Sequence, residues 1–172
     1  TVFSPNILGR IGKKQILSRI EQIYGKPLRF KYKRVEEPYD NNGVQTPFVL
    51  EVALAILSKN LGLRIYTGIN HSPSLQNPFE GYSIEWYDNG KKHKASIVRG
   101  LLEHYKIDSE QPVVLVVHLI CPNIEYESYG KGKINITPFY RALGQALTEV
   151  CRFYPRFKRR KGLAGGKTSS AR

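Results

Sequence analysis

Two lysines that alternate with glycines, in the run Gly130-Lys131-Gly132-Lys133, are the side chains best suited to bind an anion. Glycine leaves the backbone free to turn, and each lysine carries a compact ammonium group on a flexible stem. The run follows Val113–Leu119, which is apolar except for His118 and predicts a buried central strand. Pro122 ends that strand because proline has no N–H to donate. A strand that leads into a flexible loop with lysines allows an ammonium group to reach a phosphate that another surface holds.

The charge balance of the chain indicates a polyanionic partner. The 172 residues include 27 Lys and Arg against 14 Asp and Glu, which gives a formal net charge of +13. Charge of this size bears on partners rather than on fold, and nucleic acid is the first candidate. The two cysteines, Cys121 and Cys151, form neither a disulfide framework nor a zinc-binding spacing. The apolar runs are too short to cross a bilayer, so we expect no membrane partner and an intracellular location, cytoplasmic (nucleoid) or nuclear.

Hydrophobic periodicity predicts an α+β domain over residues 1–155. The pattern favours about four strands in a mixed sheet, helices packed on one face, and a long C-terminal helix. Strands Phe48–Leu57 and Leu63–Ile69 are close enough in sequence to be antiparallel neighbours, and Val113–Cys121 joins them by a crossover. Residues 156–172 contain no acid and are expected to form a basic, disordered tail. The other expected elements are helices over Gly12–Tyr24 and Ser96–Tyr105, a helix from Thr137 through Tyr154, a strand over Leu28–Glu36 with a basic solvent face, and a hairpin that turns at Asp88-Asn89-Gly90.

Two groups of cations are candidates for binding a phosphate backbone. A charge run is usually a solvated face, but here the cations exceed what the acids of the chain can neutralise. Binding of this kind carries little sequence readout. The groups are Lys91, Lys92 and Lys94 at the hairpin, and Arg156, Lys158, Arg159, Arg160 and Lys161 near the C-terminus.

Four segments, in order, resemble the transducer domain of the topoisomerase VI B subunit, an ATPase of the GHKL class. The opening VFSPNILGRIGKKQILSRI is similar to the Ser-Pro approach of that family to its first helix. TPFVLEVALAI resembles its apolar-Glu-apolar strand, and RIYTGINHSP resembles its next strand, with His71 in place of the usual arginine. VVLVVHLICPNIEYESYGK resembles its last strand and the loop that bears its switch lysine.

The resemblance implies a ribosomal-protein-like transducer fold with a left-handed βαβ crossover. It implies that Lys131 is the switch lysine, which reaches the γ-phosphate of ATP. The ATP, with Mg²⁺, would be bound mainly by a neighbouring domain outside this chain. Lys133 takes that role if the register shifts by two, and Gly130 would let the loop approach the nucleotide closely. Asn70 and His71 end a strand near a proline, where Asn70 would either form a turn or make a polar contact to the ATP-binding domain.

The partners implied by the resemblance are an N-terminal GHKL ATP-binding domain, a DNA-cleaving A-type subunit, and DNA. The chain itself has no Walker loop and no recognisable catalytic triad, so we expect it to act within an ATP-dependent type II DNA topoisomerase and not as an enzyme alone. Two alternatives stay open. One is a stand-alone basic nucleic-acid-binding module with the same fold, and the other is the transducer of a GHKL ATPase in DNA repair or defence.

Overall fold

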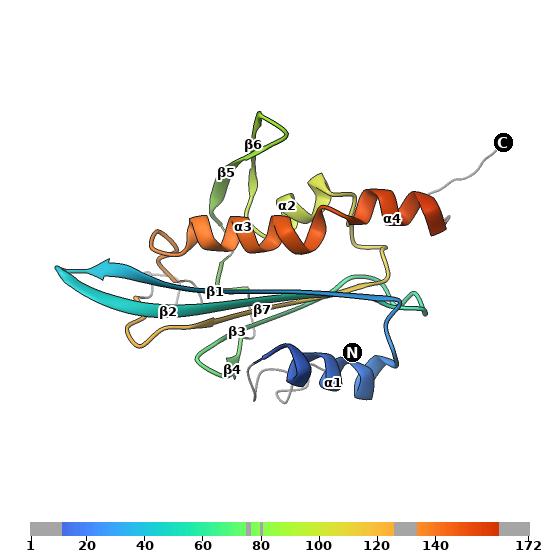
Figure 1. The fold of residues 1–172 in the computed structure, drawn as a ribbon, viewed down its shortest axis with the longest axis horizontal. Coiled ribbons are helices and arrows are strands. Elements are labelled where there is room, and N and C mark those ends of the chain that lie inside the picture. Colours follow the sequence, from blue (N-terminus) through green and yellow to red (C-terminus); the bar gives the residue numbers. More distant parts are fainter. Residues whose placement is uncertain (1–11, 75–76, 80, 126–133, 162–172) are drawn as a thin grey trace.

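A mixed β-sheet forms the middle layer of the structure, and helices cover both of its faces (Figure 1). The computed structural model describes residues 12–74, 77–79, 81–125 and 134–161. Within these residues the α+β class and the mixed sheet are confirmed, with five strands in the main sheet and two in a separate hairpin. The main sheet contains β1 (Arg29–Asn41), β2 (Val44–Ile56), β3 (Arg64–Ile69), β4 (Ser72–Pro73) and β7 (Val113–Ile120). The hairpin is β5 (Ser83–Asp88) and β6 (Lys91–Ser96), and the helices are α1 (Lys13–Tyr24), α2 (Arg99–His104), α3 (Tyr140–Cys151) and α4 (Tyr154–Lys161).

Strand β7 lies at the centre of the sheet, as its apolar run predicted. The strand order is β1-β2-β7-β3-β4, with β2 antiparallel and β3 parallel to β7. The predicted pairing of β2 with β3 was therefore wrong, because β7 lies between them. The physical reason is burial: β7 is fully enclosed from Val113 to Leu119 and needs a partner on each edge, whereas β3 begins with the half-buried Arg64 and Ile65.

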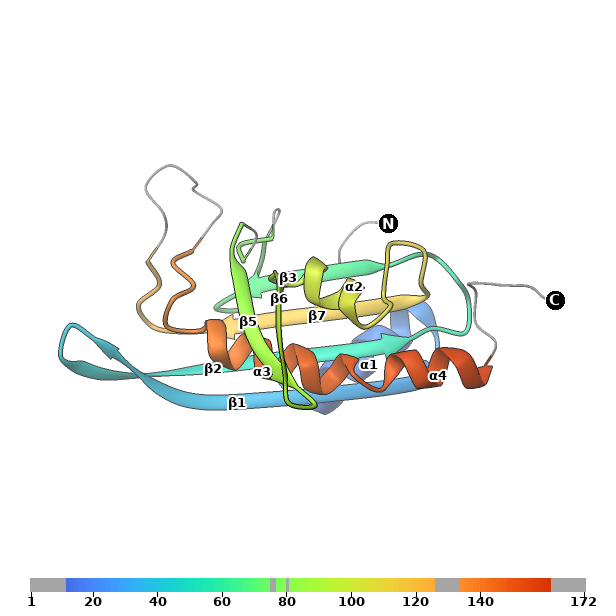
Figure 2. The same cartoon turned by 90° about the horizontal axis from the view of Figure 1, so that it is seen from above.

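The connection from β3 to β7 is left-handed. In Figure 2 both strands run to the left, the connection passes above the sheet toward the viewer, and the chain moves from β3 down to β7. Figure 1 shows the same connection, with the hairpin and α2 on the upper side of the sheet. Parallel strands are joined by right-handed crossovers in about 98% of cases. The rare hand implied by the resemblance is therefore present.

Helix α1 covers the face of the sheet opposite to the other helices (Figure 1). Its buried side chains Ile16 and Ile20 pack against Ala53 and Ala55 of β2. These small strand residues let the helix approach the sheet closely. The prediction that the helices share one face was wrong for α1, because an amphipathic pattern shows that a helix packs on a sheet but not on which face.

The other face of the sheet carries the larger core, under α2 and α3. Leu101 of α2 and Leu143 of α3 pack there with alternate residues of β2 and β7. The hairpin stands on α3 because Gly144 leaves room for Ile84, whose Cδ1 would lie 3.1 Å from a Cβ at that position. Its turn residues Asn89 and Gly90 have φ angles of 53° and 76°, which confirms the predicted hairpin.

The C-terminal region forms two helices in place of one helix and a tail. The helix predicted from Thr137 begins at Tyr140, and α4 follows α3 after a short break, with Pro155 in its first turn. Residues 156–161, which we expected to be disordered, are helical because Phe157 is buried and lies under the guanidinium of Arg29, 5.4 Å from its ring centroid. Residues 162–172 lie outside the described part of the chain. None of the described helices is long and apolar enough to cross a membrane.

The basic residues of β1 do not form the predicted solvent face. The ammonium of Lys31 lies 5.0 Å from the ring centroid of Phe153, and that of Lys33 lies 3.5 Å from the carboxylate of Glu149. Both lysines are half-buried. The reason is that α3 and α4 run along β1 (Figure 2), so the lysine stems rest against the helices while their charged ends stay near water.

Candidate functional site at the ends of strands β3 and β7

The predicted switch residues Gly130, Lys131 and Lys133 lie outside the described residues. The structure does describe the base of their loop, which follows the carboxyl end of β7. There the backbone N–H of Asn135 donates to the C=O of Glu125 at 2.8 Å. This hydrogen bond joins the two described segments that flank residues 126–133.

Two tyrosine hydroxyls hold this base to the body of the domain. The hydroxyl of Tyr39, from β1, donates to the C=O of Asn123 at 2.9 Å, and that of Tyr82 donates to the C=O of Ile134 at 3.0 Å. Burial, together with a hydrogen bond to Cys121, raises the pKa of Tyr39 to about 12. Tyr39 therefore keeps its proton and remains a donor at neutral pH.

Asn70 clamps the exit of β7. Its Oδ1 accepts the backbone N–H of Cys121 at 2.7 Å, and its Nδ2 donates to the C=O of the same residue at 2.9 Å. Asn70 and His71 form the turn after β3 with φ angles of 51° and 70°, a region that these residue types enter more readily than most. The amide of Asn70 thus positions the start of the loop, and its contact to an ATP-binding domain stays a prediction.

A buried carboxylate–imidazole pair lies beside this turn, on the α1 face of the sheet. Glu51 and His118 stand opposite each other on β2 and β7, and both are fully buried. Glu51 Oε1 accepts the hydroxyl of Tyr32 at 2.6 Å and the N–H of Gly12 at 2.7 Å, and Oε2 lies 3.1 Å from His118 Nδ1. Burial by itself raises the pKa of Glu51, but the hydrogen bonds from His118, Tyr32 and Gly12 outweigh it and hold that pKa below its ordinary value. Glu51 is therefore an anion at neutral pH.

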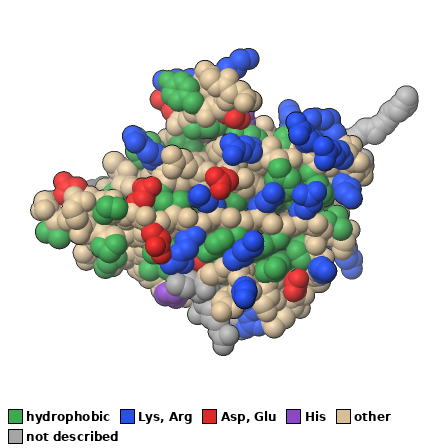
Figure 3. All heavy atoms as spheres, viewed as in Figure 1, with side chains coloured by type: hydrophobic (Ala, Val, Ile, Leu, Met, Phe, Trp, Pro, Cys, Tyr) green, Lys and Arg blue, Asp and Glu red, His purple; other side chains and the backbone are tan. Residues whose placement is uncertain are grey.

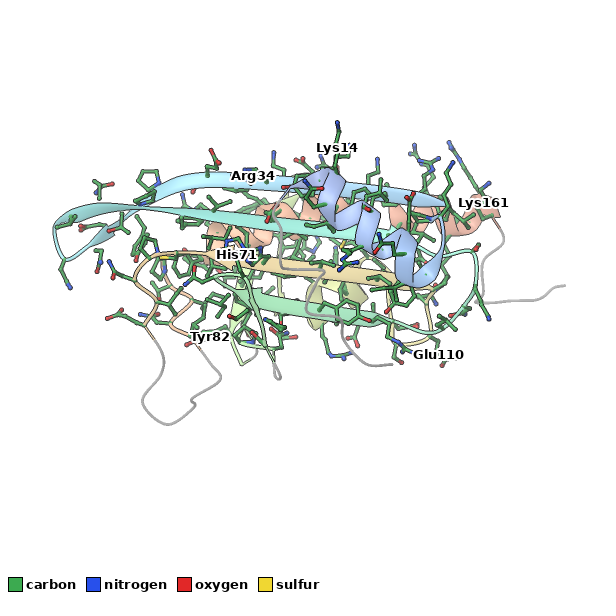
Figure 4. The ribbon with its side chains drawn as sticks, turned by 90° about the horizontal axis from the view of Figure 1, so that it is seen from below. Lys14, Arg34, His71, Tyr82, Glu110 and Lys161 are labelled. Atoms are coloured by element: carbon green, nitrogen blue, oxygen red, sulfur yellow. The ribbon has the colours of Figure 1, made fainter. Side chains whose placement is uncertain are left out.

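The contacts of His118 fix its tautomer. Its Nε2 accepts the backbone N–H of His71 at 3.0 Å, so this nitrogen carries no proton. Nδ1 therefore carries the proton and donates to Glu51. The guanidinium of Arg34 lies 3.8 Å from Glu51 and supplies a positive charge. Through these contacts the pair links the start of α1, strands β1, β2 and β7, and the turn after β3. Figure 4 labels two of the residues in contact with the pair, Arg34 and His71.

The sequence contained a signal for this pair that could not be interpreted alone. One ionisable residue interrupts each of two apolar strands, Glu51 in β2 and His118 in β7. The two become partners only in the observed register, in which they stand directly opposite. That register could not be derived while β3 was expected to be the neighbour of β2.

The predicted nucleic-acid-binding cations form two separate groups. Figure 3 shows Lys and Arg side chains on the projecting hairpin and a larger group over α4. Lys92 of the first group is paired with Glu85 at 3.2 Å. The described residues contain no group of three or more His, Cys, Asp or Glu side chains that could hold a metal ion. The hairpin group consists of Lys91, Lys92 and Lys94 on β6, and the second group of Arg156, Lys158, Arg159, Arg160 and Lys161 on α4.

Residues 86–167 match the family model of the topoisomerase VI B subunit transducer. The match covers 82 of the 172 residues, slightly less than half of the chain. The matched range begins within the hairpin and includes β7, Lys131, Lys133, α3 and α4. The chain matches none of the curated proteins with which it was compared.

Two solved structures of gyrase B are similar to the domain at a low level. The 43K ATPase domain of Thermus thermophilus gyrase B, in complex with an aminocoumarin, has a TM-score of 0.38 and 13% identity, over 87% of this chain and 39% of that chain. The B-subunit of the DNA gyrase from Myxococcus xanthus has a TM-score of 0.41 and 10% identity, over 84% of this chain and 39% of that chain. The chain thus spans 39% of the length of each structure, and a likeness this weak carries no argument.

Proposed function

We propose that this transducer domain couples ATP binding and hydrolysis in an adjacent GHKL domain to the motion of a DNA-cleaving partner. The observation that carries the proposal is the family match over residues 86–167, a range that includes Lys131. The left-handed crossover supports it, because that hand is rare and is the one implied by the family resemblance. In this proposal the parent protein is a topoisomerase VI B-like ATPase, and ATP with Mg²⁺ is bound mainly by the GHKL domain.

The base of the loop supplies the rigid attachment that such a switch needs. Asn70 holds the exit of β7, and the bond between Asn135 and Glu125 closes the base. Lys131 would then reach a γ-phosphate from a point fixed to the sheet. The contact exists only before hydrolysis, so it would bias two arrangements of the domains, by about 1–3 kcal/mol in typical switches.

The test is Lys131→Ala in the complete ATPase. We expect ATP turnover and strand passage to fall about tenfold or more, because the ammonium that meets the γ-phosphate is lost. Lys133→Ala is the matched control and should stay within about twofold of the wild-type rate. Reversal of the two results would move the switch to Lys133, and wild-type turnover in both variants would refute the assignment to this loop.

A second function, nucleic-acid binding by the domain itself, is favoured by a different observation. The cations of α4 form a dense group on one helix, with little acid nearby in the sequence. Binding of duplex DNA by the isolated chain should weaken steeply as salt rises, since released counterions drive it. Arg156→Ala with Arg160→Ala should reduce the salt slope by about 2, and Lys13→Ala with Lys14→Ala on α1 is the matched control. An unchanged slope in the α4 variant would exclude this helix as the binding surface.

A further inference from the structure

A cleft of about 540 Å³ lies between the β5–β6 hairpin and α3, and it takes no part in the site described above. Trp86 and Tyr87 of β5 form one wall, and α3 together with its C-cap Arg152 forms the other. Gly144 lies between them, where the hairpin rests directly on the helix. The cleft is therefore a product of the way in which the hairpin packs on α3.

Two exposed tyrosines on opposite walls of the cleft indicate an interaction surface. Tyr87 is 71% exposed and Tyr140 is 40% exposed, and they come from opposite walls. Trp86 is held in place by ring contacts with His93 and His104, at centroid distances of 5.4 Å and 5.3 Å. Tyrosine, tryptophan and arginine are the residue types that contribute most to binding at protein–protein interfaces.

The charges of the cleft leave two arginines available. Glu149 is paired with Lys33 at 3.5 Å, and Glu85 is paired with Lys92 at 3.2 Å. No carboxylate among the described residues forms a salt bridge with Arg141 or Arg152. Arg152 caps the C-terminus of α3 with helical backbone angles and lies eleven positions after Arg141, which places the two residues about 16 Å apart along the helix axis.

We propose that this cleft binds an acidic segment of a protein partner. Two carboxylates of the segment would meet Arg141 and Arg152, and an aromatic side chain between them would contact Tyr87 and Tyr140. A nucleic-acid strand fits less well, because its evenly spaced phosphates would also meet the carboxylates of Glu85 and Glu149 in the same cleft. A peptide can place its charges to avoid them. The proposal does not depend on a coupling role for Lys131.

The spacing of the arginines gives a sharp test with model peptides. In an extended peptide, about five residues at 3.3 Å each span the distance between Arg141 and Arg152. The probe is a short fluorescent peptide with two glutamates at that spacing and a tryptophan between them. The control peptide has the same composition with the glutamates adjacent. Because the two peptides carry equal charge, general attraction to a chain of net charge +13 affects both alike.

We expect the spaced peptide to bind the 172-residue chain at least about tenfold more tightly than the control peptide, by fluorescence anisotropy near physiological salt. Arg141→Glu with Arg152→Glu should remove this preference. Arg156→Glu with Arg160→Glu on α4 is the matched control and should keep it. Tyr87→Ala should weaken the spaced peptide about fivefold or more without a loss of folding, because this side chain is exposed.

Three results would overturn the proposal. The first is equal affinity for both peptides, which means attraction by net charge alone, and the second is binding of neither peptide. The third is loss of single-stranded oligonucleotide binding in the Arg141→Glu, Arg152→Glu variant while peptide binding is unchanged. That outcome would assign the cleft to nucleic acid.

Discussion

Replacement of Glu51 by glutamine tests whether the buried pair with His118 depends on its charge and its hydrogen bonds. The carboxylate accepts three hydrogen bonds, from Tyr32, Gly12 and His118. A glutamine has one acceptor oxygen and an NH₂ group. If the oxygen serves Tyr32 and Gly12, the NH₂ group faces the Nδ1–H of His118, so two donors meet.

A change of tautomer does not relieve this conflict. If His118 moves its proton to Nε2, that proton meets the backbone N–H of His71, which now donates to the same nitrogen at 3.0 Å. At least one buried donor therefore stays unsatisfied, at a cost of about 1–3 kcal/mol, and the remaining bonds lose their charge assistance. We expect Glu51→Gln to lower the free energy of unfolding by about 2–4 kcal/mol.

The assay is urea unfolding of the 172-residue chain, followed by circular dichroism at several pH values. The folded-state pKa of Glu51 lies below the ordinary glutamate value of 4.5, because hydrogen bonds from His118, Tyr32 and Gly12 outweigh its burial. Its contribution to stability is therefore full above that ordinary value and is lost as pH falls through the folded pKa. The stability difference between wild type and Glu51→Gln should therefore shrink below about pH 4.5. Glu149→Gln is the matched control, because that exposed carboxylate should contribute at most about 1 kcal/mol.

Two results would refute this reasoning. One is a cost below about 0.5 kcal/mol for Glu51→Gln at pH 7, which is the range of ordinary surface changes. The other is a stability difference that stays constant down to pH 3. Either would mean that the pair contributes packing and not an ionised, hydrogen-bonded network.

Three further predictions concern the loop base, α4 and the buried thiol. Asn70→Ala should lower the free energy of unfolding by about 1–3 kcal/mol and speed hydrogen exchange at the backbone N–H of Cys121. Asn70→Asp keeps the oxygen that accepts this N–H, so it should keep the N–H protected from exchange. Equal exchange rates in the two variants would exclude the clamp. Phe157→Ala should lower the free energy of unfolding by about 2–4 kcal/mol, measured by thermal or urea unfolding, because this ring is buried. If residues 156–161 were disordered, the substitution would leave the free energy of unfolding unchanged. Burial raises the pKa of Cys151, so iodoacetamide should alkylate it only after unfolding, and rapid reaction with the native chain would contradict its burial.

The elements that the sequence predicted well are those with a strong local signal. Seven consecutive buried positions, Val113–Leu119, left little alternative to a central strand. The Asn89-Gly90 pair predicted the hairpin because both turn positions have positive φ. Four segments that resemble the topoisomerase VI B transducer in the same order likewise predicted that family, and the match over residues 86–167 supports the prediction.

The features that the sequence did not predict depend on contacts between distant elements. The place of β7 between β2 and β3 depends on which strands bury the most surface, and short sequence separation gave the wrong neighbour. Residues 156–161 have a composition typical of a tail, but Phe153 and Phe157, one turn apart, attach α4 to Lys31 and Arg29 of β1. Composition cannot reveal such an anchor, because it does not show which surface the aromatic rings meet.

The residues of the predicted site also differ in how much of their role the sequence could reveal. Asn70 was recognised as a polar residue at a strand end, but its two bonds to Cys121 required the adjacency of β3 and β7. The assignment of Lys131 to the γ-phosphate stays a prediction, since that residue lies outside the described part of the chain.

The most direct test of the central proposal is the preference of the complete ATPase for a triphosphate over a diphosphate. The affinities for a non-hydrolysable ATP analogue and for ADP are compared in wild type and in Lys131→Ala. The coupling proposal predicts that the variant weakens binding of the analogue by about 5- to 150-fold, as a coupling of 1–3 kcal/mol requires, and leaves ADP binding unchanged. Equal loss for both nucleotides, or loss for neither, would contradict a contact between this lysine and the γ-phosphate.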